Sequence, residues 1–137
     1  MIDQIITLIF AVACSMGTLS QYDQASTDMV LYNRSVFGVT SYALPENREG
    51  VTGYIAVYDC ERIGQVVTVS WSNHVERLMV FDCAGDDATR QWMKRWNVIG
   101  EVDFYTAQRW GTLGQGMYGA TLCPAGVGEY QQDTLTR

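Results

Sequence analysis

The sequence predicts a single, mainly β domain that carries one or two short helices and is held by disulfide bonds. Its 137 residues correspond to one domain. Hydrophobic residues make up 47% of the chain and charged residues 18%, a balance that favours a folded core over disorder. Short segments rich in Val, Ile, Thr, Tyr and Trp predict strands. Thirteen glycines against two prolines favour tight turns between these strands.

The first part of the chain is interpreted as strands and turns. A strand at residues 18–22 precedes a polar loop, and the apolar residues 29–32 are interpreted as another short strand. A turn-rich loop follows at residues 44–50. Three further strands are predicted at residues 53–58, 65–71 and 76–81. The polar turn at residues 72–74 predicts that the last two strands form a hairpin.

The composition then changes to that of a helix. Residues 85–87 (Gly-Asp-Asp) are a helix-start signal, and the helix is expected at about residues 87–96. Met93 and one of the two tryptophans, Trp92 or Trp96, are expected to face inward.

The rest of the chain predicts strand, helix and strand. Residues 98–102 form a strand, and Asp103 can cap a second short helix at about residues 104–110. Gly111 ends that helix, because glycine adopts the left-handed backbone of a helix C-terminus at no steric cost. A closing strand is expected at residues 117–122.

The cysteines predict disulfide bonds in an oxidising compartment. None of the four forms a Cys-x-x-Cys pair, and His74 is the only histidine, so we expect no metal site and no cofactor. Disulfides then point to a secreted or extracellular location, or to the cell envelope. The cysteines are Cys14, Cys60, Cys83 and Cys123.

The charge balance argues against one class of partner. The chain has nine Lys and Arg against fifteen Asp and Glu, a net charge of −6. Duplex nucleic acid is bound by basic side chains that neutralise phosphates, so no nucleic-acid partner is expected.

The N-terminal segment allows two interpretations. Residues 5–13 form an apolar run that is too short to span a bilayer. The run is similar to the apolar part of a signal peptide, although Asp3 stands where Lys or Arg is usual. A retained arm is the alternative, and self-association through residues 1–16 would follow from it. The expected division is this segment, a globular domain at residues 17–125 and a polar tail at residues 126–137.

Several motifs carry a resemblance to a known superfamily. Residues 80–83 read Val-Phe-Asp-Cys, and residues 101–111 read Glu-Val-Asp-Phe-Tyr-Thr-Ala-Gln-Arg-Trp-Gly. Residues 57–60 (Val-Tyr-Asp-Cys) and the following Gly64 resemble a strand-turn-glycine passage, and residues 116–123 resemble a final strand. Together they resemble the double-psi β-barrel of expansins, barwin-like proteins, rare-lipoprotein-A-like lytic transglycosylases and family-45 endoglucanases.

The resemblance implies a small, closed, six-stranded double-psi β-barrel that acts on or binds polysaccharide or peptidoglycan. The segment at residues 86–97 departs from the family pattern, because it is longer and more helical. The resemblance also implies a pairing of the cysteines, since Cys60 and Cys83 each end a strand of the same barrel passage. Cys14 and Cys123 then remain to bridge the two ends of the domain.

Carboxylates are the candidate catalytic groups. Asp103 falls on the family's aspartate and is the candidate general acid, although its local sequence by itself favours a helix N-cap. Asp82 is a candidate base or electrostatic partner, with a turn aspartate as the other interpretation. Tyr22 and Asp23 are expected to bind substrate, together with Tyr105 and Trp71, whose rings can stack on sugar faces. A non-catalytic structural or interaction module, such as a subunit of an extracellular or viral assembly, is the alternative function.

Overall fold

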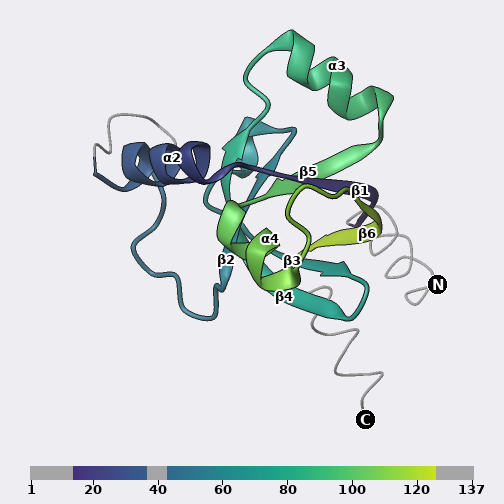
Figure 1. The fold of residues 1–137 in the computed structure, drawn as a ribbon. Coiled ribbons are helices and arrows are strands. Elements are labelled where there is room, and N and C mark those ends of the chain that lie inside the picture. Colours follow the sequence, from purple (N-terminus) through teal and green to yellow (C-terminus); the bar gives the residue numbers. More distant parts are fainter. Residues whose placement is uncertain (1–13, 37–42, 126–137) are drawn as a thin grey trace, which may run out of the picture.

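The computed structural model describes residues 14–36 and 43–125, which form a closed six-stranded barrel (Figure 1). Around the barrel the order is β1-β5-β2-β4-β3-β6. The mainly β, closed barrel is therefore confirmed, and so is the antiparallel β3–β4 hairpin, in which Trp71 lies opposite His74. The strands are β1 (Ser15–Gln21), β2 (Gly53–Val57), β3 (Val66–Trp71), β4 (His74–Cys83), β5 (Val98–Val102) and β6 (Met117–Pro124).

The barrel mixes parallel and antiparallel pairs. β1 runs parallel to β5 and β2 runs parallel to β4, while the other four neighbouring pairs are antiparallel. Parallel neighbours need crossover connections, because a tight turn joins only antiparallel strands. Between β1 and β5 the chain runs through β2, β3 and β4, and between β2 and β4 it runs through β3. Separate helices lie between β1 and β2 and between β4 and β5.

The barrel interior is filled by one face of each strand, as the two-residue period of a strand requires. On β2, Ile55 and Val57 point into the interior, while Ala56 between them belongs to a second apolar cluster outside the barrel. The interior is aliphatic, and its fully buried members include Leu19, Val67, Val69, Leu78, Val80, Val102, Met117 and Leu122.

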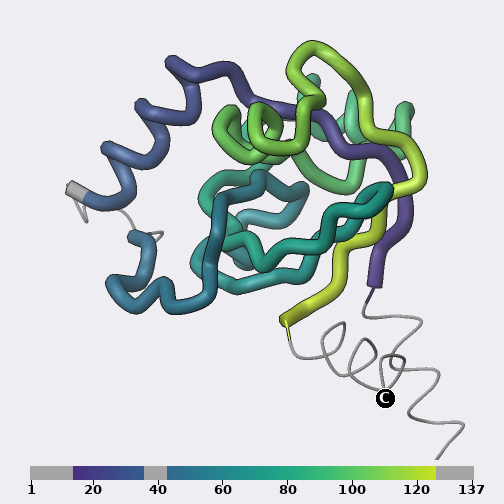
Figure 2. The backbone as a smooth tube through the Cα atoms, turned by 60° about the horizontal axis from the view of Figure 1, so that its bottom comes forward, coloured from purple at the N-terminus to yellow at the C-terminus, as the bar shows by residue number. Residues whose placement is uncertain are grey.

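Helix α2 (Gln24–Val36) covers the second cluster, and the interpretation of residues 29–32 as a strand is wrong. The carboxylate of Asp23 accepts a hydrogen bond from the backbone N–H of Ser26 at 2.7 Å, which caps the helix start. The inner face of the helix packs toward Phe81 and Ala56, and Met29 and Tyr32 are exposed. Figure 2 shows α2 beside the barrel. A four-residue apolar run fits either a strand or a helix, and the N-cap at Asp23 favours the helix.

Helices α3 (Asp87–Arg95) and α4 (Phe104–Trp110) confirm the two predicted helices. Met93 is buried as expected, but the tryptophan prediction is wrong, because Trp92 is 39% exposed and Trp96 is 59% exposed. Helix α3 lies outside the barrel (Figure 1) and buries only a narrow stripe, which Met93 fills against Ala84 and Val98. The indoles of Trp92 and Trp96 lie on the neighbouring face, outside this stripe, and remain exposed.

Two disulfide bonds join the pairs of cysteines that were predicted. Cys60 is bonded to Cys83, and Cys14 is bonded to Cys123. The second bond spans 109 residues and joins the start of β1 to the end of β6, which lie side by side (Figure 2). No cysteine of the described segments is free.

Candidate functional site

A pocket of about 360 Å³ lies outside the barrel, where β1 ends and α2 begins. It brings together Tyr22, Asp23 and Asp82, three of the residues that the sequence singled out. Glu101 joins them from β5, and it was not among the predicted site residues. The complete lining is Gln21, Tyr22, Asp23, Ser26, Met29, Val30, Asp82 and Glu101.

The strand register explains why Asp82 and Glu101 face the same pocket. Ala56 of β2 is paired with Glu101 of β5 on one side and with Asp82 of β4 on the other. The preceding pair of β2 and β4 is Ile55 with Val80. From that pair to Ala56 with Asp82, β2 advances by one residue and β4 by two, so Phe81 is the extra residue of a β-bulge. The bulge sets Asp82 in line with Ala56. Two interstrand spacings, about 10 Å, therefore separate the backbones of the two acidic residues.

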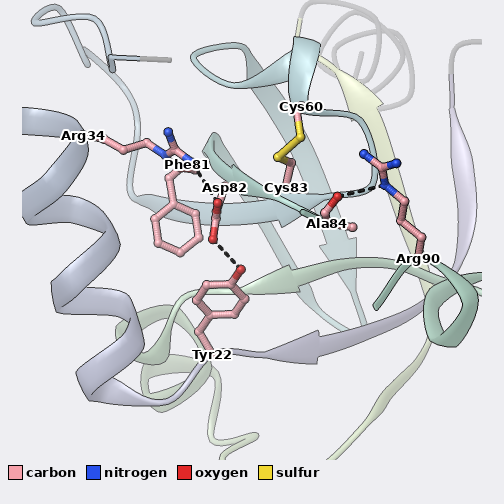
Figure 3. Close-up of a disulfide and its surroundings, with 8 residues drawn as sticks. All are labelled: Tyr22, Arg34, Cys60, Phe81, Asp82, Cys83, Ala84 and Arg90. Atoms are coloured by element: carbon pink, nitrogen blue, oxygen red, sulfur yellow. Dashed lines mark hydrogen bonds and ion pairs between the residues drawn. A yellow bond between two sulfur atoms is a disulfide. The ribbon is translucent and has the colours of Figure 1, made fainter. Parts of the chain in front are cut away.

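The carboxylate of Asp82 is held on both oxygens (Figure 3). The hydroxyl of Tyr22 donates to Oδ2 at 2.7 Å, and Nη2 of Arg34 donates to Oδ1 at 2.9 Å. Nε of Arg34 also donates to the carbonyl oxygen of Phe81, so the guanidinium is fixed at the bulge. These hydrogen bonds from a cation and a hydroxyl hold the Asp82 carboxylate in a fixed orientation at the pocket wall.

Burial changes the titration of two neighbours of Asp82. It raises the pKa of the Glu101 carboxyl, and the negative charge of Asp82 adds a smaller rise, while a hydrogen bond from Ser20 acts in the opposite direction. Burial also raises the pKa of the Tyr22 hydroxyl, and its hydrogen bond to Asp82 strengthens that effect. Tyr22 therefore remains a donor to Asp82. The pocket pairs a held carboxylate with a carboxyl that retains its proton to higher pH.

Asp103 lies elsewhere and is enclosed, with 2% of its surface exposed. Its Oδ2 accepts from the backbone N–H groups of Tyr105 at 3.0 Å and Thr106 at 3.2 Å, which caps α4. Its Oδ1 accepts from the N–H of Tyr54 at 2.8 Å and from the hydroxyl of Thr106. The side chain thus joins α4 to β2. A general acid must reach its substrate, and this carboxylate has neither a free oxygen nor an open path to solvent.

The neighbour of Asp103 on β2 is Gly53, and its lack of a side chain permits the close approach. A Cβ at this position would overlap with Oγ1 of Thr106 and lie 3.0 Å from Oδ1 of Asp103. The start of β2 and the start of α4 therefore meet only because residue 53 is glycine.

The two other predicted substrate-binding residues do not line the pocket. The hydroxyl of Tyr105 donates to Asp28 at 2.7 Å, across the contact between α4 and α2. Trp71 donates its indole N–H to the carbonyl oxygen of Tyr118 at 3.0 Å. Its ring stacks on His74, which in turn stacks on Trp110, with centroid separations of 6.2 Å and 5.0 Å. Trp71 thus stabilises the β3–β4 hairpin and, through His74, its contact with the end of α4.

Two residues of the site escaped the sequence argument. Glu101 is the outward residue of an alternating strand, and alternation predicts only that it leaves the core. Arg34 lies on α2, the helix that the sequence argument did not predict. A capping signal at Asp23 followed by Ser26 was the local feature that could have revealed this helix.

Comparison of this chain with protein-family models, with curated proteins and with solved structures finds no match. Within residues 14–36 and 43–125, no three His, Cys, Asp or Glu side chains are grouped so that they could hold a metal ion. No helix in these segments is long and apolar enough to cross a membrane. The barrel and the geometry of its pocket are therefore the features that bear on function.

Proposed function

We propose that this protein is a secreted double-psi β-barrel of the expansin and rare-lipoprotein-A kind, and that it cleaves a cell-wall polysaccharide at the pocket beside α2. A closed six-stranded barrel with two parallel pairs supports the fold-family assignment. The two disulfide bonds support an oxidising location. The residues of the motif, which include Asp82 and Asp103, lie at the ends of strands as the resemblance requires.

The observation that carries the catalytic proposal is the pairing of Asp82 and Glu101 in one pocket with different environments. Two carboxyl groups whose surroundings separate their protonation states can divide the roles of acid and base. We assign the acid to Glu101, because burial raises its pKa and it lines the pocket, whereas Asp103 is enclosed.

The proposed reaction is hydrolysis of a glycosidic bond. Glu101 gives its proton to the bridging oxygen as the bond from that oxygen to the anomeric carbon breaks. Arg34 and Tyr22 hold the Asp82 carboxylate in the pocket, where it stabilises the positive charge that develops on the sugar ring. Water then adds to the anomeric carbon and loses a proton to Asp82, whose oxygens can each accept a second hydrogen bond.

The spacing of the two acids suits this mechanism. A backbone separation of about 10 Å, two strand spacings, favours a carboxyl pair with room for a water molecule between its members. Two further polar side chains of the pocket wall, Asp23 and Ser26, offer acceptors for sugar hydroxyl groups, while the amide of Gln21 is bonded to Thr112, Gly114 and Gln115.

The test is release of reducing sugar from purified wall polysaccharide fractions. We expect Glu101→Gln to abolish release and to retain binding of the polymer, because the amide keeps the shape of the side chain but cannot donate the proton. Asp82→Asn should lower the rate strongly. Glu46→Gln, which changes an exposed carboxylate outside this pocket, is the matched control. A Glu101→Gln variant with the wild-type rate would refute the assignment of the acid.

A non-catalytic module is the second candidate, and one observation favours it. Asp103, the aspartate of the family motif, is wholly engaged in capping α4 and joining it to β2. If the wild-type protein binds wall polymer and releases no sugar from any fraction, the barrel acts as a binding or interaction module instead. Self-association through residues 1–16 belongs to this alternative and stays a prediction, since residues 1–13 lie outside the described segments.

A further inference from the structure

We propose that helix α3 carries a second binding surface, which holds polysaccharide chains that bear carboxylate groups. The surface, here called the α3 face, consists of Trp92, Arg95 and Trp96. It is separate from the pocket beside α2, since no α3 residue lines that pocket. The inference goes beyond the proposed hydrolysis, and it holds whether or not the pocket is catalytic.

The first argument is the placement of the two indoles. Trp92 lies in the last turn of α3, and Trp96 is the C-cap residue, whose backbone N–H donates to the carbonyl oxygen of Trp92 at 3.1 Å. Residues with this spacing are neighbours on one side of a helix, with Cβ atoms about 5–6 Å apart. Both side chains are exposed, while Met93, on the neighbouring face of the helix, is buried against Ala84 and Val98. Two neighbouring exposed indoles offer apolar ring surface, and such rings can stack on sugar faces.

The second argument is charge. Arg90, Lys94 and Arg95 are three of the nine basic residues of a chain whose net charge is −6. The guanidinium carbon of Arg95 lies 5.4 Å from the ring centroid of Trp96, so a cation stands next to this exposed indole. Arg90 and Lys94 lie over the ring of Tyr58 on the adjacent flank of the helix. This local positive charge selects an anionic partner and directs it to α3.

The acidic groups near α3 do not neutralise the positive charge beside Trp96. Asp86 is the N-cap of the helix, and its carboxylate accepts from the N–H of Thr89 at 2.7 Å. Asp87 lies in the first turn, on the flank of Tyr58, Arg90 and Lys94. Arg95 and Trp96 are at the other end of the helix, where a basic side chain is also favoured by the helix dipole.

The chemistry of the α3 face favours a polysaccharide over a membrane or a nucleic acid. Insertion into a bilayer requires a broad apolar stripe, but Met93 points into the protein, and exposed Gln91 and Arg95 flank the indoles. Single-stranded nucleic acid is held by a basic groove along its backbone, and an acidic protein with one local cluster lacks that groove. A polyuronate needs only a flat ring for each sugar face and a cation for its carboxylate.

The experiment measures binding of the full chain to sodium polygalacturonate and to a neutral polysaccharide, dextran, by affinity electrophoresis at low and high salt. We expect wild type to bind the polyuronate more tightly than dextran, and to bind it less tightly at high salt. The variant Trp92→Ala/Trp96→Ala should bind roughly tenfold or more weakly, judged by the loss seen when stacked rings are removed from other polymer-binding sites. Arg95→Gln should reduce the preference for the polyuronate over dextran.

Two controls make the result specific. Tyr118→Ala removes an aromatic ring that is 77% exposed on β6, and it should leave polyuronate binding unchanged. Glu46→Gln, which changes an exposed carboxylate outside the pocket, should also bind polyuronate like wild type. Binding is measured without any hydrolysis readout, so a failure of the proposed hydrolysis would not be mistaken for a failure of the α3 face. Wild-type melting temperatures for all variants would show that binding losses do not arise from unfolding.

Three outcomes would overturn the inference. The first is no detectable binding of wild type to polygalacturonate at low salt. The second is equal binding by wild type and Trp92→Ala/Trp96→Ala. The third is tighter binding of wild type to vesicles of phosphatidylserine and phosphatidylcholine, or to an oligothymidine strand, than to the polyuronate, since α3 would then serve a different class of partner.

Discussion

Replacement of Asp103 by Asn tests whether this carboxylate is the structural link that its contacts indicate. Oδ1 accepts from the N–H of Tyr54 and Oδ2 accepts from the N–H groups of Tyr105 and Thr106. An amide has only one oxygen, so in either orientation its NH₂ group faces at least one backbone N–H. The less costly orientation keeps the cap and leaves the N–H of Tyr54 without its acceptor, while the hydroxyl of Thr106 can rotate to accept.

The expected loss follows from these contacts. A buried donor left without a partner costs about 1–3 kcal/mol, and the remaining hydrogen bonds lose the strength that the charge gives them. We therefore expect Asp103→Asn to lower the free energy of unfolding by about 2–4 kcal/mol, a large fraction of the usual 5–15 kcal/mol.

The assay is urea denaturation followed by circular dichroism. Asp86→Asn is the matched control, because Asp86 caps α3 at an exposed position with one accepted backbone N–H, and Asn caps a helix as well as Asp. The control should lose less than about 0.5 kcal/mol. A loss this small for Asp103→Asn would refute the reasoning, and Asp103 would again be available as a catalytic candidate.

Three further predictions concern the Glu101 carboxyl, the contact of Gly53 with Thr106 and the two disulfide bonds. Burial raises the pKa of Glu101, so the folded chain holds the proton to higher pH than the unfolded chain and loses stability as pH rises above about 4.5. Glu101→Gln should therefore be more stable than wild type at pH 7 in urea, with the difference vanishing below pH 4.5; an equal difference at both pH values would contradict this. Gly53→Ala should cost about 1–3 kcal/mol in thermal unfolding, because its Cβ overlaps with Thr106, and an unchanged melting temperature would count against this contact. Removing the Cys14–Cys123 bond should cost about 5 kcal/mol and removing Cys60–Cys83 about 3 kcal/mol, since the closed loops span 109 and 23 residues; the reverse order under urea would disprove the loop-length argument.

The strands and two of the helices were predictable because their signals are local. Alternation of apolar residues, the polar turn at residues 72–74 and the glycine at residue 111 each act within a few positions of the chain. Gly111 has a φ of 71°, the left-handed backbone that a helix end favours. The disulfide pairs were predicted from the resemblance to a family of barrels. The register of β1 with β6 agrees with the bond between Cys14 and Cys123.

Helix α2 and the tryptophans of α3 were predicted wrongly because hydrophobicity alone does not say which surface a residue meets. The apolar residues 29–32 fit a strand or a helix, and the barrel closes without a strand from this segment. Trp92 and Trp96 were expected inside, but α3 meets the barrel along a stripe that Met93 fills. Burial depends on what lies opposite a helix face, which the sequence does not state.

The sequence by itself determined a small, disulfide-bonded β domain, because strand alternation, turns and cysteine usage are properties of neighbouring residues. Only the tertiary structure decided which acidic residues share a site. The pairing of Ala56 with both Asp82 and Glu101 joins residues from three strands, and the bulge at Phe81 sets their alignment. The same structure encloses Asp103 between α4 and β2. Whether a carboxylate caps a helix or faces a pocket depends on the segments that close around it, and those segments are distant in the chain.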